Sequence, residues 1–257
     1  MELYVVAAGV AVYLAVGAIY WGLGQRGAAL RYFEDAVISL IFILVVQAIF
    51  SAASQVASLA GIEINLWSSL EVSKAFATAS RVFWNASRRA VDLIFFVEAE
   101  KAVLASTPLT APLVNVLSGS TGWSLSELSL VAIVYMHFSF VSEVFSMISA
   151  YMLTIGSTLT PVPKLRKLGV SLLSLYISTS LAIVFSSQIT CDALTKTRLP
   201  QAVNPADWVN IASIVGDAAV ELGRVMTLSL VASALATIGG IGLASAFDSI
   251  IVSVLKP

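Results

Sequence analysis

Charged residues are scarce in this chain of 257 residues, where they make up only 11% of the sequence. Soluble domains carry roughly 25% charged residues, whereas 58% of this chain is hydrophobic and its mean hydropathy is +0.94. A water-soluble globule of this size cannot bury so much apolar surface. The composition excludes a soluble enzyme, a disordered chain and a fibrous repeat. It predicts an all-α, polytopic helical membrane protein.

Cysteine and histidine occur once each, as Cys191 and His137. A single cysteine excludes an internal disulfide framework and a cysteine-based metal site, and no carboxylate stands at ligand spacing from His137. We therefore expect neither a metal nor a cofactor. The chain also lacks the phosphate-loop, serine-hydrolase and zinc-protease motifs. We expect no enzymatic activity, so energised transport needs a partner motor or an ion gradient.

Five apolar runs are long enough to cross a membrane, which takes about 20 helical residues. They cover 3–23, 36–60, 128–156, 168–189 and 225–247, and Glu143 is the only formal charge inside them. This separation of apolar runs from charged segments predicts transmembrane helices one and two within 1–60 and helices three and four within 128–189. Residues 61–127 form an external insertion, and 190–257 hold an external loop, an amphipathic helix and transmembrane helix five.

Basic residues near the span ends predict the orientation. They gather between spans one and two, between spans three and four, and after span five: Arg26, Arg31, Lys164, Arg166, Lys167 and Lys256. We expect these segments in the cytoplasm of a multi-pass plasma-membrane protein, with the N-terminus outside and the C-terminus inside. Lys196 and Arg198 then lie outside. The turn that carries Lys164, Arg166 and Lys167 is the expected contact for a cytoplasmic partner.

The external insertion contains a strongly patterned helix at 72–97. Apolar residues repeat in alternating steps of four and three, which places them on one stripe of a helix: Val72, Phe76, Ala79, Phe83, Ala86, Ala90, Leu93 and Val97. Lys74, Arg81 and Arg88 repeat every seven residues on the opposite face, with Arg89 to one side and Trp84 adjacent. One interpretation is a solvated face with an Arg88–Asp92 pair. The other is a DNA-facing stripe, where cations contact phosphates and Trp84 stacks on bases.

Polar side chains also stand in and beside the spans. Glu143 shares a broad face of span three with serines, including Ser139 and Ser146. A carboxylate is rarely left facing lipid, so it lines a pore or is buried in an inter-helix contact. Before span five, Asp217, Glu221 and Arg224 belong to a polar helix face, and Glu221 and Arg224 are spaced to form a pair. This face serves either packing between subunits or the lining of a vestibule.

Spans three and four are joined by the stretch TLTPVPKLRKLG at 158–169. This proline-plus-basic turn, with the five-span layout, resembles the polytopic inner-membrane subunit of bacterial conjugative type IV secretion systems. In length and helix-rich composition the chain is closer still to the CedA-like family of archaeal DNA-import membrane proteins. The resemblance implies a DNA-translocating subunit assembled as a homo-oligomeric ring, such as a pentamer, in membrane lipid. It also implies small accessory membrane subunits and a separate conjugation-type motor ATPase.

Two other functions stay open from the residues alone. A proton-coupled small-solute transporter could use Glu143 and His137, although such folds often show repeats and broken helices, and this sequence shows neither. A non-conducting membrane scaffold would need only the apolar helices and their contacts. A ring that retains an ATPase favours the DNA-channel prediction, whereas a monomer that couples ligand binding to protons favours the transporter.

Overall fold

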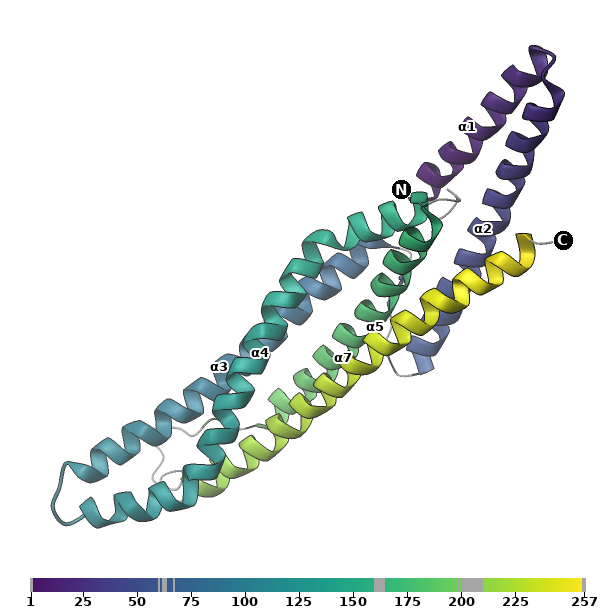
Figure 1. Ribbon diagram of the computed structural model, residues 1–257. Helices are drawn as coiled ribbons and strands as arrows, with labels where there is room; N and C mark the ends of the chain where they lie inside the picture. Colours follow the sequence, from purple (N-terminus) through teal and green to yellow (C-terminus); the bar gives the residue numbers. More distant parts are fainter. Residues whose placement is uncertain are drawn as a thin grey trace. The chain divides into compact units, whose positions relative to one another are not determined.

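The computed structural model describes residues 2–59, 61, 64–66, 68–159, 165–197, 199 and 210–255. These residues contain no β-strand and form long helices joined by short connections (Figure 1). The helices are α1 (Glu2–Gly22), α2 (Arg26–Leu59), α3 (Ser69–Ala105), α4 (Ala111–Leu159), α5 (Arg166–Lys196) and α7 (Ile211–Leu255). The all-helical class is confirmed for the part of the chain that the structure describes.

Among the residues that the structure describes, three helices are long and apolar enough to cross a membrane, at Ala111–Leu159, Lys167–Lys196 and Ile211–Ala246. They contain the predicted spans at 128–156 and 168–189 and nearly all of the one at 225–247. A shorter apolar stretch, Val10–Gly22, is found in the fully described part of α1. A helical membrane protein is therefore supported, while the first two spans, the orientation and the plasma membrane stay predictions.

Two predicted boundaries fall inside continuous helices. The insertion was expected to end at 127, but α4 runs without a break from Ala111 to Leu159. The amphipathic segment before span five and the span itself are likewise one helix, α7. In the polar start of α4, Thr121 and Ser126 donate hydrogen bonds to the backbone carbonyls of Leu117 and Gly122, one turn earlier. Such bonds satisfy a polar side chain within its own helix.

The chain folds as two compact units. Unit 1 comprises residues 1–73, 147–181 and 235–257, and unit 2 comprises residues 74–146 and 182–234. In unit 1, α1 and α2 form an antiparallel hairpin (Figure 1). Gly24 turns the chain with a φ of 76°, and the Gln25 amide donates to the Tyr20 carbonyl at 3.0 Å. A left-handed glycine with this bond is a common way to end a helix.

The rest of unit 1 is organised around Tyr176 on α5. Its ring contacts Phe50 of α2, with the centroids 6.1 Å apart, and its hydroxyl donates to the Leu66 carbonyl at 3.0 Å. α4 and α5 approach closely at Gly156, where an added Cβ would lie 2.9 Å from Leu173 Cγ and 3.2 Å from the Gly169 carbonyl oxygen. These contacts bring the connection after α2, the end of α4 and the start of α5 together.

Candidate functional site

The apolar stripe of α3 is the buried seam that its spacing predicts. All eight stripe residues are at most 1% exposed: Val72, Phe76, Ala79, Phe83, Ala86, Ala90, Leu93 and Val97. The next seam position is Glu100, which is 7% exposed. Its Oε2 has no hydrogen-bond partner among the described residues, and burial raises the pKa of this carboxyl above its ordinary range. The seam therefore ends on a buried acid.

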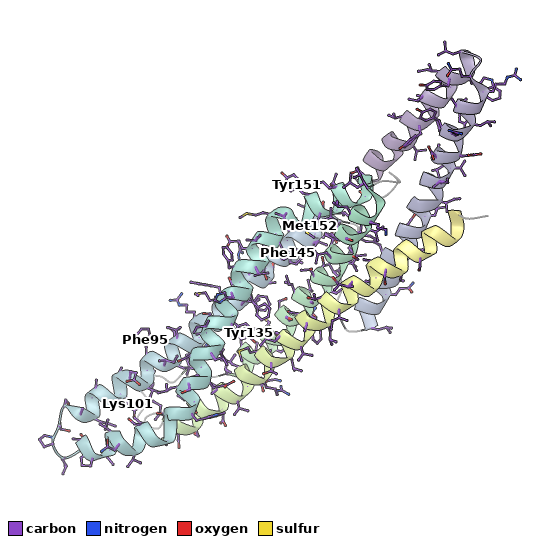
Figure 2. The ribbon with its side chains drawn as sticks, viewed as in Figure 1. Phe95, Lys101, Tyr135, Phe145, Tyr151 and Met152 are labelled. Atoms are coloured by element: carbon purple, nitrogen blue, oxygen red, sulfur yellow. The ribbon has the colours of Figure 1, made fainter. Side chains whose placement is uncertain are left out.

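In unit 2 the seam of α3 packs against α4, and the two helices run antiparallel (Figure 1). Phe83 stacks on Tyr135 with the ring centroids 5.8 Å apart and contacts Phe138 at 5.5 Å, while Phe76 meets Phe145 at 5.8 Å. Figure 2 labels Tyr135 and Phe145 along α4. The Ser87 hydroxyl donates to the Ala132 carbonyl at 2.8 Å. Residues 76–87 of α3 thus lie beside residues 132–145 of α4.

This pairing bears on the predicted external position of α3. Residues 132–145 lie in the middle of the predicted span 128–156, and α4 is one of the helices apolar enough to cross a membrane. If α4 crosses the membrane at 132–145, the α3 segment packed beside it would lie at the same depth. The external position of α3 stays a prediction. The sequence could not reveal the pairing of α3 with α4, because the apolar seam predicts a buried face without naming the helix that covers it.

The opposite face of α3 carries the predicted cations. Lys74, Arg81 and Arg88 are exposed, and no ion pair or hydrogen bond joins their side chains to another residue that the structure describes. The Arg88–Asp92 pair considered above is thus not formed. Trp84 lies on the same side of the helix and is 54% exposed. The chain presents three unpaired cations at heptad spacing together with an aromatic ring.

Arg89 is separated from this group. It is partly buried, and its Nη1 donates to the Thr197 carbonyl at 3.0 Å, immediately after the last residue of α5. A guanidinium at that position satisfies an end carbonyl and interacts favourably with the negative end of the helix dipole. Arg89 therefore holds α3 against the end of α5 within unit 2. The sequence spacing of Arg89 predicted a position to one side of the cationic face. The structure shows that its guanidinium contacts the Thr197 carbonyl there.

A charged cluster surrounds the same end of α5. Glu221 on α7 accepts a hydrogen bond from Arg224 Nη2 at 3.1 Å, and Lys196 Nζ lies 3.5 Å from the same carboxylate oxygen. The predicted Glu221–Arg224 pair is confirmed, while Lys196 was not expected there. Beside the cluster is a cavity of about 420 Å³ lined by Lys196, Thr197, Ile214, Asp217, Ala218 and Glu221. Because Lys196 and Glu221 are far apart in sequence, no local pattern could pair them.

The three apolar helices of unit 2 meet at buried hydroxyl groups. The Tyr135 hydroxyl of α4 lies 3.2 Å from the Thr190 hydroxyl of α5 and is hydrogen-bonded to Ser229 of α7. All three side chains are fully buried. A buried hydroxyl without a partner is costly in an apolar setting, so these groups fix how α4, α5 and α7 pack. Sequence reasoning missed this centre, although a tyrosine within an apolar run was a usable signal.

The polar residues predicted in span three are distributed over different surroundings. Ser139 is buried and lies 3.1 Å from the Ser80 hydroxyl of α3, which is an inter-helix contact. Glu143 is exposed, and Ser146 donates to its backbone carbonyl. His137 is also exposed, with Nδ1 2.8 Å from the Ile133 carbonyl oxygen. Within the described residues, Glu143 and His137 form no acid–base pair with each other.

The turn expected to face a cytoplasmic partner is described only in part. Lys164 lies outside the described residues, as do residues 160–163. Arg166 is the first residue of α5, and Lys167 is exposed. No family model, curated protein or solved structure matches this chain.

Proposed function

We propose that this chain is a channel subunit of a conjugation-like DNA-transfer machinery that imports DNA, and that it works as a homo-oligomer with a separate ATPase. The observation that carries the proposal is the position of the unpaired cations of α3. They share a helix with a seam that is packed against the apolar stretch of α4. Charged side chains at membrane depth face a bundle interior or a water-filled cavity and avoid lipid.

A water-filled path explains this arrangement if several copies surround it. One chain leaves Lys74, Arg81 and Arg88 uncovered, and a ring of copies would turn them toward a common axis. Residues seven apart rise about 10 Å along a helix, so each copy would present a ladder of positive charge along the path. Such ladders attract a polyanion through its phosphates without reading its sequence. Trp84 adds a surface on which an unpaired base can stack.

The cations can be tested by a DNA-transfer assay in cells whose own gene is replaced by a variant. The triple variant K74Q/R81Q/R88Q should lower the transfer frequency at least about tenfold, because three phosphate contacts are lost. Membrane abundance and oligomer size in detergent should not change, since these exposed side chains form no hydrogen bond or ion pair with a described residue. Transfer at the native frequency by a well-expressed triple variant would refute the proposal.

A single-charge comparison separates a local effect from a general loss of positive charge. R88Q removes an unpaired cation, whereas K101Q removes the cation on the same helix that pairs with Glu98 at 2.8 Å. Only R88Q should reduce transfer. Equal reductions in both variants would mean that net charge, and not the cationic face, is what matters. Co-purification of the native chain with a motor ATPase supplies an independent check on the assembly.

A further inference from the structure

The turn between α1 and α2 contains a second polar feature, far in sequence from the cationic face of α3. A cavity of about 650 Å³ opens at this turn in unit 1 and is lined chiefly by Tyr20, Gln25, Gly27, Arg31, Tyr32 and Asp35. The Tyr20 and Tyr32 rings are stacked, with centroids 5.3 Å apart and planes 10° from parallel. Both rings belong to the lining of the cavity, together with residues of the turn and of the start of α2.

The positive charge at this turn has no acidic partner among the described residues. Arg31 is exposed and makes no ion pair or hydrogen bond to any of them. Arg26 lies with its guanidinium 5.7 Å from the centre of the Trp21 ring, in cation–π contact. Within the lining, Arg31 and Asp35 contribute one positive and one negative charge, so Arg31 is the single cationic group that the cavity offers to a phosphate.

The backbone at this turn is open to a ligand. An added Cβ at Gly27 would meet nothing within 4 Å, so a ligand can approach the backbone there. The amides of Arg26, Ala28 and Ala29 already donate to the carbonyls of Gly24 and Gln25. The cavity and the unpaired Arg31, and not the helix end, therefore supply the site.

The hairpin that carries the cavity has the surface of a lipid-facing element. Large apolar side chains are exposed on both helices, including Val12 and Ile19 on α1 and Leu40 and Leu44 on α2. The residues near the turn are instead aromatic and basic: Tyr20, Trp21, Arg26, Arg31 and Tyr32. Aromatic and basic residues at the end of apolar helices are typical of the membrane interface, and basic pockets between such helices bind lipid head groups.

We propose that the cavity at the α1–α2 turn binds the phosphate group of a membrane phospholipid, with Arg31 as its principal contact. Gln25 and the tyrosine hydroxyls line the same cavity and can donate further hydrogen bonds to the phosphate oxygens. The lipid's acyl chains would then lie along the exposed apolar faces of the hairpin. This site does not depend on the DNA-channel proposal, since it uses a different unit and different residues.

Native mass spectrometry of the full chain in detergent tests the site with three probes. Phosphatidylglycerol carries the phosphodiester and acyl chains, diacylglycerol has the chains without phosphate, and inorganic phosphate has no chains. Phosphatidylglycerol should be retained, and R31Q should weaken its binding about tenfold through loss of a charge-assisted hydrogen bond. R31K should bind with intermediate affinity, because lysine keeps the charge but loses the two-pronged geometry. R88Q is the matched control and should bind as the native chain does.

Three results would overturn the proposal. Equal retention of diacylglycerol and phosphatidylglycerol would show that the acyl chains alone account for binding. Equal weakening by R31Q and R88Q would show that general charge attraction is responsible. Binding of inorganic phosphate in an Arg31-dependent manner, without retention of phosphatidylglycerol, would assign the cavity to a soluble phosphate compound. The melting temperature of R31Q should stay within about 2 °C of the native value, because Arg31 is exposed and forms no hydrogen bond or ion pair with a described residue.

Discussion

Replacing Phe83 with alanine tests the α3–α4 pairing on which the proposed channel depends. The side chain is fully buried and meets two aromatic rings of α4 at 5.8 and 5.5 Å. Truncating a buried phenylalanine costs about 3–5 kcal/mol, and each aromatic contact contributes about 0.5–1.5 kcal/mol of specific interaction. We therefore expect F83A to lower the free energy of unfolding by at least about 3 kcal/mol.

Phe95 provides the matched control on the same helix. It is 69% exposed (labelled in Figure 2), so F95A should change stability by less than about 0.5 kcal/mol. Unfolding of the full chain can be followed by helical circular dichroism during titration of mixed micelles with a denaturing detergent. Equal shifts of the transition by F83A and F95A would show that the contacts of Phe83 with α4 do not hold α3 in place.

Two further substitutions test other contacts. G156A places a Cβ 2.9 Å from Leu173 Cγ and 3.2 Å from the Gly169 carbonyl oxygen, and such overpacking should destabilise the chain by about 1–3 kcal/mol. An added Cβ at Gly239 meets nothing within 4 Å, so G239A should stabilise the folded chain by up to about 1 kcal/mol. The same micelle titration measures both variants. Destabilisation by G239A would contradict the open surroundings of Gly239. The raised pKa of Glu100 means that the folded chain holds this proton more tightly than the unfolded chain. Its stability is then greatest below the ordinary value of 4.5 and falls as pH rises through the folded pKa. E100Q should accordingly raise the melting temperature at pH 8 and change it little at pH 4, and an equal change at both would contradict a buried acid.

The amphipathic helix was predictable because its pattern is local. Alternating steps of four and three from Val72 to Val97 define one face whatever covers it, and the structure buries all eight residues. The partner of that face was not predictable. The stretch from Ser118 to Gly122 is rich in serine and glycine, which disfavour helix interiors, so α4 was not expected to begin at Ala111. Packing overrides that local propensity, since Thr121 in this stretch and Leu117 just before it are buried.

Among the charged and polar contacts, likewise, only the local ones could be predicted from the sequence. Glu221 and Arg224 are three residues apart, so helical geometry alone brings them together. Lys196 joins them from α5, and Arg89 reaches the end of α5 from α3. Tyr135, Thr190 and Ser229 meet from three helices. Each of these contacts depends on how distant segments pack, which a single sequence does not encode in any local period.

Thiol labelling from the aqueous phase tests the central proposal, that the cationic face of α3 lines a water-filled path beside a membrane-crossing α4. Single cysteines are placed at Arg81 or at Phe140 in a C191S background, because Cys191 is exposed and would itself react. Phe140 is 67% exposed on α4 in the same unit. In intact membranes we predict rapid labelling of R81C and protection of F140C by lipid. Protection of R81C, or equally rapid labelling of both, would contradict the proposal.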